Sequence, residues 1–358
     1  MRRARNLISL LLLAAAVGLF AVAAVASAGE TGASPAPASA GSPAPSPTAT
    51  PSLTLAAVPA AITAGDSVTI TVRIGVPGAT VQLSRKGAAA ADFSAVGPLV
   101  TNARGVATFR ALPRETMTYR VDYAGDGVQW LPASAEVTLP VSPRVSFSAT
   151  ARVYRGDRVR VAVTVRPAHP AASVVIQRRQ DGAWADWRTL TLGAKSSAQT
   201  TWRADAVGAW PLRAVMAADA THAQGASPVH KVVVVKPNPY HVPIDAKSMI
   251  VVDISQYRLH FFSLGSEVRS FPCVTGRPSL PTPLGHFKIY ARGMWPGGPY
   301  GARIMSYHPP CAIHGTDEPW LLKKFPRNFS HGCTRLLNAN AIWLYDRAPL
   351  GTPVWNVR

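Results

Sequence analysis

Residues 330–336 read Ser-His-Gly-Cys-Thr-Arg-Leu, and a second segment, Cys-Ala-Ile-His-Gly, precedes them at residues 311–315. The two segments bring one cysteine, Cys333, close in sequence to two histidines, His314 and His331. Acyl transfer by a cysteine needs a nucleophilic thiol, a base, and hydrogen-bond donors for a developing oxyanion. Because a neighbouring imidazolium lowers a thiol pKa from about 8.5, we expect Cys333 to be an activated nucleophile.

The same residues have two other interpretations. Cys333 can be a buried structural thiol, or it can join His314 and His331 in a zinc site. The His-Gly-Cys spacing is too tight for a usual tetrahedral zinc finger, and the chain contains no Cys-x-x-Cys pair, so we predict no metal site here. Cys273 and Cys311 either form a disulfide that leaves Cys333 as the free thiol, or both remain free and buried.

The cysteine motif resembles the signature of the L,D-transpeptidase catalytic domain (YkuD type), which crosslinks bacterial peptidoglycan, and the resemblance covers residues 240–358. Residues 274–278 and 281–289 resemble the Thr-Gly and Thr-Pro-x-Gly-x-Phe segments of these domains, which flank the cleft. The chain departs from the family at residues 323–329, Lys-Lys-Phe-Pro-Arg-Asn-Phe, where many members carry a small residue. The preference for donor or acceptor is therefore expected to be unusual.

The resemblance assigns a role to each residue of the motif. Cys333 is the nucleophile, and His314 is the base that contacts its sulfur. The carbonyl of Gly315 holds the other ring nitrogen of His314, in place of a carboxylate. His331 orients the loop and stabilises charge.

Further residues of the motif have supporting roles by the same resemblance. The main-chain amides of Gly332 and Cys333 are expected to form the oxyanion hole, where a glycine suits a backbone that turns its N–H groups inward. Ser330 fixes the loop by hydrogen bonds, and Arg335 supports the site by engaging a stem carboxylate. Trp320 and Tyr307 either flank the substrate channel or pack in the core.

The resemblance implies that Cys333 attacks the bond between the diamino residue and D-Ala of a donor tetrapeptide stem. An acceptor stem then resolves the thioester, giving a 3→3 crosslink without a metal or organic cofactor. Carbapenems should acylate the same sulfur. The alternatives are an L,D-carboxypeptidase, an enzyme that attaches a protein to the wall, and a non-enzymatic wall-binding protein, against which the intact motif argues.

The N-terminus indicates export. Residues 1–28 have a basic start, an apolar run and an Ala-Ser-Ala site, which fit either a cleaved signal peptide or an uncleaved membrane anchor. Both place the remainder outside the cytoplasm, at the cell wall. Residues 29–52 consist almost entirely of Pro, Ala, Ser, Thr and Gly, so we expect a disordered linker.

The middle of the chain contains an internal repeat. Gly-Asp-Ser-Val-Thr-Ile-Thr-Val at residues 65–72 recurs as Gly-Asp-Arg-Val-Arg-Val-Ala-Val at residues 156–163, which is 91 residues later. Thr-Phe-Arg at residues 108–110 matches Thr-Trp-Arg at residues 201–203, which is 93 residues later. We therefore expect two extra residues near His169 in the second copy.

Apolar residues alternate within each copy, which is typical of half-buried strands. Short strands with frequent turn signals predict two immunoglobulin-like β-sandwiches, at residues 53–142 and 143–236. Tryptophans in these modules form either a sugar-stacking face or core contacts. With the core interpretation, we expect the modules to act mainly as rigid spacers and only secondarily as wall-binding units. These residues are Trp130, Trp184, Trp187, Trp202 and Trp210.

The predicted fold is therefore mostly β: two tandem immunoglobulin-like sandwiches, then a β-rich L,D-transpeptidase catalytic domain at residues 240–358. One short helix is expected late, with Asn338 as its N-cap, and residues 351–355 are expected to include a closing strand.

The charge of the chain narrows its partners. The formal net charge is +19, although only 15% of residues are charged. A basic surface fits anionic wall polymers, an anionic membrane or nucleic acid. The charges are scattered and form no basic block with interleaved aromatics, so we predict no nucleic acid partner. Peptidoglycan stems, and with them anionic wall polymers, are the expected partners.

Overall fold

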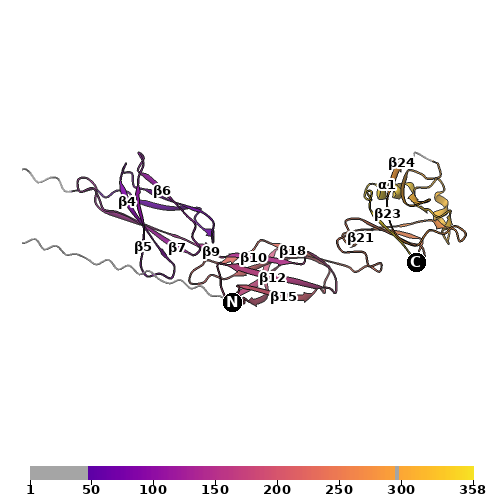
Figure 1. Ribbon diagram of the computed structural model, residues 1–358, viewed down its shortest axis with the longest axis horizontal. Coiled ribbons are helices and arrows are strands. Elements are labelled where there is room, and N and C mark those ends of the chain that lie inside the picture. Colours follow the sequence, from indigo (N-terminus) through magenta and orange to yellow (C-terminus); the bar gives the residue numbers. More distant parts are fainter. Residues whose placement is uncertain (1–46, 295–297) are drawn as a thin grey trace, which may run out of the picture. The chain divides into compact units, whose positions relative to one another are not determined.

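The computed structural model describes residues 47–294 and 298–358 (Figure 1). The predicted signal peptide or anchor at residues 1–28 lies outside this part of the chain. The predicted linker at residues 29–52 extends too far, because Ala49 accepts a main-chain hydrogen bond from Leu131 and forms a bridge with Trp130. In the described residues, no helix has both the length and the apolar character needed to cross a bilayer.

The first module consists of two antiparallel sheets. One contains, in order, β1 (Thr54–Val58), β3 (Val68–Arg73) and β6 (Val106–Ala111). The other contains, in order, β5 (Ser94–Val100), β4 (Thr80–Gly87), β7 (Met117–Tyr123) and β8 (Ala133–Leu139). A short parallel pair joins β2 (Ile62–Thr63) to β9 (Val141–Ser142). Ile70 of the first sheet shares a buried cluster with Leu83 and Tyr119 of the second, so the core lies between the sheets.

The second module repeats this arrangement. Its smaller sheet contains, in order, β10 (Arg144–Ala149), β12 (Arg158–Arg166) and β15 (Ser197–Arg203). Its larger sheet contains, in order, β11 (Arg152–Tyr154), β18 (His230–Val235), β16 (Gly208–Met216), β13 (Ser173–Gln180) and β14 (Ala183–Thr191), and β17 (Gly225–Ala226) pairs with β16. The parallel pair of β11 and β18 closes one edge.

The strands confirm the internal repeat. β3 and β12 occupy the centre of equivalent three-stranded sheets, and the two later matching segments lie in the equivalent edge strands β6 and β15. β4 begins at Thr80 and β13 begins at Ser173, which is 93 residues later. The connections at residues 74–79 and 167–172 both have six residues, so the two extra residues lie at the end of β12, close to His169 in the chain. Assignment of the modules to the immunoglobulin-like class stays a prediction.

Tryptophans of the second module pack in its core. Trp202 and Trp210 are each 6% exposed, and Trp187 packs edge-on against Trp202, with ring centroids 4.7 Å apart. The guanidinium of Arg178 lies over the Trp210 ring, 3.4 Å from its centroid. A buried ring cannot stack on a sugar, so the core interpretation is correct for Trp202 and Trp210.

The C-terminal domain contains two main sheets. The larger has the order β21 (Ser266–Pro272), β20 (Arg258–Ser263), β19 (Met249–Asp253), β29 (Pro353–Val357) and β23 (Gly285–Lys288). The other has the order β24 (Ala291–Met294), β25 (Arg303–His308), β26 (Cys311–His314) and β28 (Thr334–Arg335). A separate pair joins β22 (Thr275–Gly276) to β27 (Asn328–Ser330), and a 3₁₀ helix spans Pro319–Lys323. Ile250 of β19 and Ile313 of β26 belong to the same buried cluster, so the two sheets share one core.

The predicted late helix and closing strand are present as α1 (Asn338–Tyr345) and β29. The N-cap prediction is wrong, because Leu337 occupies that position and makes no side-chain cap. The Asn338 side chain has another use: its Oδ1 accepts the main-chain N–H groups of Ala302 at 3.1 Å and Thr316 at 3.0 Å. It therefore joins two loops on either side of β25 and β26.

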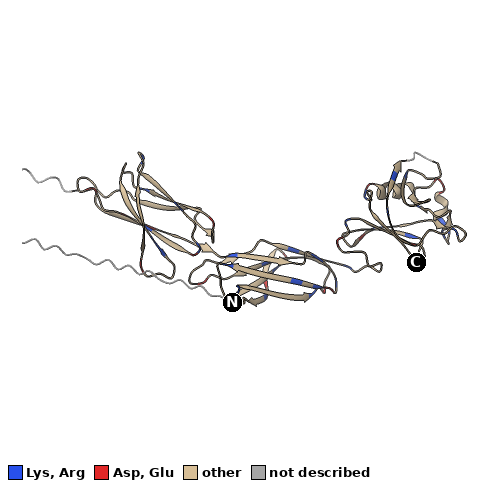
Figure 2. Cartoon of the chain, in the orientation of Figure 1, with Lys and Arg blue, Asp and Glu red and all other residues tan. Residues whose placement is uncertain are grey.

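Lys and Arg side chains occur on strands and loops of both modules and the C-terminal domain, with Asp and Glu between them (Figure 2). Some basic side chains pair with acidic ones, as Arg144 does with Asp66 at 2.7 Å. This dispersed pattern agrees with the sequence prediction of scattered charge.

Replacing Trp202 with alanine should destabilise the second module by about 3–5 kcal/mol, because it removes a large buried ring from the core. Trp184→Ala is the matched control, since Trp184 is only half-buried and stacks on Arg213. We expect the control to lower stability by about 1 kcal/mol or less. Hydrogen exchange of the amides in β12 and β15 measures the stability of this module alone. Equal losses in the two variants would contradict the core assignment.

Candidate active site

Parallel pairing of β26 with β28 brings the two halves of the cysteine motif together. Ile313 lies opposite Thr334, and His314 lies opposite Arg335. Cys333 directly precedes β28, and its Sγ accepts a hydrogen bond from the Ala312 N–H at 3.4 Å. Side chains two residues apart on a strand share a face. The Cys333 thiol, level with Ala312, and the His314 imidazole therefore lie on the same face of this sheet.

His314 is buried, and one carbonyl fixes its tautomer. Its Nδ1 lies 2.5 Å from the Gly315 carbonyl oxygen, as expected from the sequence. A carbonyl only accepts hydrogen bonds, so Nδ1 carries the proton and Nε2 keeps a lone pair. The ring also packs edge-on against Tyr300, with centroids 5.1 Å apart. His314 is therefore held in the form that can accept a proton at Nε2.

The imidazole is neutral at pH 7. Burial lowers the pKa of His314 to about 4, and the positive charge of Arg335 acts in the same direction. The Gly315 carbonyl and the charge of Asp317 oppose this shift without cancelling it. A ring with so low a pKa is uncharged throughout the physiological range.

The thiol is neutral as well. Burial raises the pKa of Cys333, and the Ala312 N–H and the charge of Arg335 only reduce that increase. The expectation that an imidazolium lowers this pKa is therefore wrong for the free site, because the His314 imidazole carries no charge. The site contains a thiol and an imidazole, and no ion pair joins them.

Hydrogen bonds fix the loop that carries the cysteine. Ser330 Oγ donates to the Cys333 carbonyl at 2.6 Å and accepts from the Gly332 N–H at 3.1 Å. Thr282 Oγ1, from the second family segment, donates to the Gly332 carbonyl at 2.9 Å and accepts from the Gly276 N–H at 2.8 Å. These bonds agree with the predicted supporting role of Ser330, and they add Thr282 to the residues that shape the loop.

Gly332 has two reasons to be a glycine. Its φ of +113° lies in a region that L side chains rarely adopt. A Cβ at this position would also lie 2.9 Å from Cys311 Sγ. Its amide, however, donates to Ser330 and is not free for an oxyanion, contrary to the sequence prediction. The Cys333 N–H has no acceptor among the described residues, so its predicted role as an oxyanion donor stays a prediction.

His331 and Arg335 differ in their contacts. His331 is exposed and makes no hydrogen bond or ion pair within the described part of the chain, so no contact supports its predicted role. Arg335 is 14% exposed, and its Nη1 pairs with Glu318 Oε2 at 2.6 Å. Its Nε is buried without an acceptor among the described residues. The partner Glu318 was not predicted.

The remaining cysteines are free. Cys273 and Cys311 belong to the buried core of the C-terminal domain, and neither forms a disulfide. The alternative of two free buried thiols is therefore the correct one. Tyr307 is also core, at 3% exposed, whereas Trp320 is 53% exposed. The described residues contain one close group of three His, Cys, Asp or Glu ligands, and it does not include Cys333.

Comparison with known proteins assigns the C-terminal domain. Residues 247–355 match the YkuD family, described as the L,D-transpeptidase catalytic domain. The chain is 34% identical to YkuD of Bacillus subtilis (strain 168) over 119 residues, which is 33% of this chain and 68% of the Bacillus protein. The chain belongs to the YkuD family of L,D-transpeptidases. YkuD of Bacillus licheniformis is 33% identical over 106 residues, 29% of this chain and 62% of that protein.

Solved structures of L,D-transpeptidases are also similar to this chain. An Enterococcus faecium L,D-transpeptidase mutant has 22% sequence identity and a TM-score of 0.26, and the match covers 31% of this chain and 49% of that one. This chain therefore spans about half of the Enterococcus structure. An L,D-transpeptidase from Mycobacterium smegmatis has 20% identity and a TM-score of 0.28, and the match covers 61% of this chain and 100% of that one.

Gly332→Ala should destabilise the C-terminal domain by more than Gly351→Ala. Gly351 has a comparable φ of +82°, but a Cβ there meets nothing within 4 Å. The left-handed conformation costs both variants about 1–2 kcal/mol, and the clash with Cys311 adds about 1–3 kcal/mol in Gly332→Ala alone. Unfolding in urea, monitored by hydrogen exchange of the amides in β26, measures the difference in stability between the two variants. It should disappear when Cys311→Ala removes the sulfur, and a persistent difference would contradict the clash.

The neutral site predicts how the reactivity of Cys333 depends on pH. Burial raises the thiol pKa above its usual value of about 8.5. The rate of alkylation by iodoacetamide should therefore still be rising at pH 8.5. Site-resolved mass spectrometry measures the rate at Cys333. His314→Gln should leave the profile in place, because the imidazole contributes no charge at these pH values. A plateau that begins below pH 7 would instead indicate a thiolate paired with an imidazolium.

Proposed function

We propose that this chain is a peptidoglycan L,D-transpeptidase that forms 3→3 crosslinks through a thioester on Cys333. The observation that carries the proposal is the pair of Cys333 and His314 on one face of β26 and β28, with the proton of His314 held at Nδ1 by Gly315. Membership of the YkuD family supports the reaction class. The donor would be a tetrapeptide stem, and no metal or organic cofactor takes part.

The first half-reaction acylates the sulfur. As Sγ attacks the carbonyl between the diamino residue and D-Ala, the thiol proton passes to Nε2 of His314. The developing oxyanion accepts a hydrogen bond from the Cys333 N–H. The C–N bond then breaks, the imidazolium returns the proton to the leaving amine of D-Ala, and a thioester remains. Because both groups are neutral at rest, charge appears only as the reaction proceeds.

The second half-reaction transfers the acyl group. The side-chain amine of an acceptor stem attacks the thioester carbon, and His314 removes a proton from this amine. The C–S bond breaks, the sulfur leaves as a thiolate, and His314 returns the proton to it. The products are a 3→3 crosslink and the free enzyme, so one histidine acts as base and acid in turn.

Arg335 supports substrate binding in this proposal. Its Nη1 is paired with Glu318, but its Nε is a buried donor without an acceptor among the described residues. An unpaired buried donor is costly unless a partner arrives. A carboxylate of a stem peptide is such a partner, and its charge would be complementary to the guanidinium. His331 is exposed and near Cys333 in the chain, so it is free to contact an acceptor.

The setting of the enzyme is part of the proposal. Residues 1–28 would direct the chain out of the cytoplasm, by secretion or by a membrane anchor. The two β-rich modules would act as spacers that carry the catalytic domain to the wall. The net charge of +19 would favour contact with anionic wall polymers. Nucleic acid is not a partner in this proposal.

A second candidate uses the same thioester with another acceptor. Water as acceptor makes the chain an L,D-carboxypeptidase, and an amine on a protein makes it a wall-attachment enzyme. The exposed, basic segment at residues 323–329, just before the motif, is the observation that favours a different acceptor. Phe325 in it is 75% exposed and Lys323 and Lys324 are exposed too, where the family more often has small residues.

Incubation with a defined tetrapeptide stem separates these functions. We expect release of D-Ala and a dimer whose mass is that of two stems minus one D-Ala, detected by mass spectrometry. Tripeptide without dimer would indicate the carboxypeptidase instead. Cys333→Ala should abolish all products, and His314→Gln should slow acylation by about 100-fold or more, because it removes the general base.

Carbapenem labelling tests the nucleophile independently of the acceptor. The active chain should gain one carbapenem mass on the peptide that contains Cys333, and Cys333→Ala should gain none. Cys311→Ala serves as the matched control, because it removes a neighbouring thiol and leaves the nucleophile. An active preparation without an adduct, or unchanged activity in Cys333→Ala, would contradict the proposed mechanism.

A further inference from the structure

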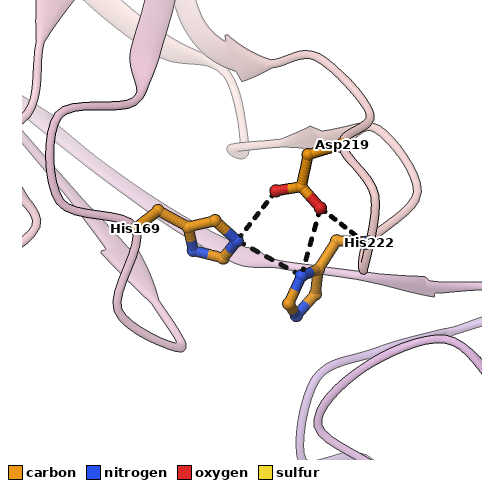
Figure 3. Close-up of side chains that lie close together, drawn as sticks. All are labelled: His169, Asp219 and His222. Carbon is orange, nitrogen blue, oxygen red and sulfur yellow. Dashed lines mark hydrogen bonds and ion pairs between the residues drawn. The ribbon is translucent and has the colours of Figure 1, made fainter. Parts of the chain in front are cut away.

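Two loops of the second module bring together His169, Asp219 and His222, far in sequence from the cysteine motif (Figure 3). His169 lies between β12 and β13, and the other two residues lie between β16 and β17. His169 Nε2 is 3.1 Å from Asp219 Oδ2 and 3.2 Å from His222 Nδ1. The side chains of His169 and His222 are only 9% and 6% exposed, and that of Asp219 is 34% exposed.

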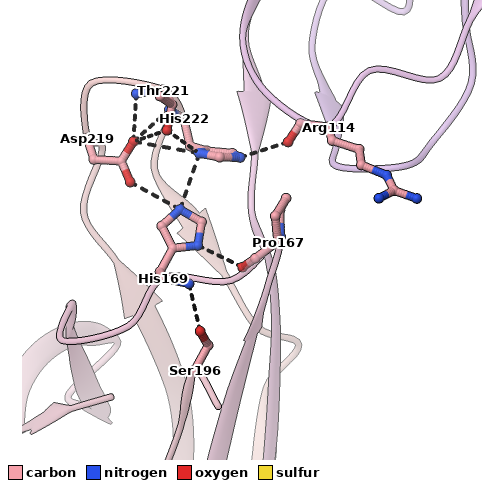
Figure 4. Close-up of polar contacts among 7 residues, drawn as sticks. All are labelled: Arg114, Pro167, His169, Ser196, Asp219, Thr221 and His222. Atoms are coloured by element: carbon pink, nitrogen blue, oxygen red, sulfur yellow. Dashed lines mark hydrogen bonds and ion pairs between the residues drawn. The ribbon is translucent and has the colours of Figure 1, made fainter. Parts of the chain in front are cut away.

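Each imidazole points its outer nitrogen at a main-chain carbonyl (Figure 4). His169 Nδ1 lies 2.8 Å from the Pro167 oxygen, and His222 Nε2 lies 2.7 Å from the Arg114 oxygen. Carbonyls only accept, so both outer nitrogens carry a proton. In the neutral rings, the inner nitrogens, His169 Nε2 and His222 Nδ1, therefore face each other with lone pairs.

Asp219 adds a third acceptor to this pair. Its Oδ1 accepts the N–H groups of Thr221 at 2.7 Å and His222 at 2.8 Å, which leaves Oδ2 directed at His169. Thr221 Oγ1 is 2.9 Å from Asp219 Oδ1 and 2.8 Å from His222 Nδ1, and its single proton satisfies only one of them.

We infer that His169 Nε2, His222 Nδ1 and Asp219 Oδ2 form a binding site for a divalent cation, and that Zn²⁺ is the ion this ligand set suits. Two imidazoles and a carboxylate are a common protein ligand set for zinc. Metal–ligand bonds of about 2.0–2.2 Å place tetrahedral ligand atoms roughly 3.3–3.5 Å apart. The two separations from His169 Nε2, 3.1 and 3.2 Å, need only a small expansion, and all the ligand atoms lie within 4.8 Å of one another.

The outer hydrogen bonds fit the same conclusion. Histidines that bind a metal usually donate their other N–H to a carbonyl or carboxylate, which fixes the ring and its tautomer. His169 and His222 both have such a carbonyl partner. The partial exposure of Asp219 leaves a side from which the ion can enter and a water can complete the coordination.

The first module supplies an internal comparison. Asp126 stands 93 residues before Asp219, and its Oδ1 accepts the N–H groups of Val128, Gln129 and Trp130. This aspartate therefore orders its turn without any histidine. Gln129 occupies the position equivalent to His222, and residues 74–79, which connect β3 to β4 as residues 167–172 connect β12 to β13, contain no histidine. The turn needs only the aspartate, so its structure does not explain the two histidines.

Zinc binding would connect the two loops of the second module and stabilise it. Ligand binding to the folded state alone raises the unfolding temperature as the ligand concentration rises. The ion would be structural, and the proposed acyl transfer at Cys333 does not depend on it. Activity of the C-terminal domain is therefore expected to be the same with and without zinc.

The test is titration of the full chain with Zn²⁺, purified without a histidine tag and carrying Cys333→Ala to remove the accessible thiol. Calorimetry should give one ion per chain, and Co²⁺ should produce the visible absorption bands of a tetrahedral site. Zn²⁺ should also raise the unfolding temperature of the second module. His169→Gln should weaken Zn²⁺ binding by at least about 100-fold and remove the bands and the thermal shift.

Asp126→Asn is the matched control for Asp219→Asn, because each removes the aspartate that orders the equivalent turn. Only Asp219→Asn should weaken metal binding. His241→Gln, a substitution of an exposed histidine outside the group, should also leave binding intact. Absence of binding, binding that survives His169→Gln, or equal losses in the two aspartate variants would each overturn the inference.

Discussion

The main-chain hydrogen bonds between the parallel strands β26 and β28 hold the two halves of the cysteine motif against each other. Residues separated by some twenty positions in the chain become neighbours across this pairing, which brings Cys333 level with Ala312, two residues before His314. The same pairing buries His314, and burial sets the charge of the site. Geometry and electrostatics of the candidate active site therefore have one origin, the packing of these strands over the shared core.

Because His314 is buried, most of the groups that hold it and the cysteine loop in place are main-chain groups. A charged partner for His314 would need its own compensation in a region that excludes water. The Gly315 carbonyl fixes the tautomer without adding a charge. The loop is fixed in a similar way, by the Ser330 and Thr282 hydroxyls on main-chain groups. The one nearby ion pair, Arg335 with Glu318, keeps the guanidinium oriented while Glu318 remains partly exposed.

The sequence pattern predicted the features of the fold that depend on residues close together in the chain. Alternating apolar residues correctly predicted strands in both modules, because a strand that buries one face has an apolar residue at every second position. The family resemblance predicted that Cys333 and His314 act together, and their segments lie on neighbouring strands. The predictions that Asn338 caps the helix and that the Gly332 N–H binds an oxyanion were wrong. In the folded chain, Asn338 Oδ1 accepts the Thr316 N–H, and the Gly332 N–H donates to Ser330. The sign of the Cys333 pKa shift failed for the same reason, as burial is a property of the whole domain.

The two modules show where a repeated fold is free to change. The sheets keep the same strand order because their alternating side chains fill a common core, whereas the loops are not constrained by it. Asp126 and Asp219 already order equivalent turns through their own hydrogen bonds. A turn that is ordered in advance loses little further entropy when a ligand binds. In the proposed zinc site, two histidines, one of them on the connection between β12 and β13, would be enough to convert a structural aspartate into a metal ligand.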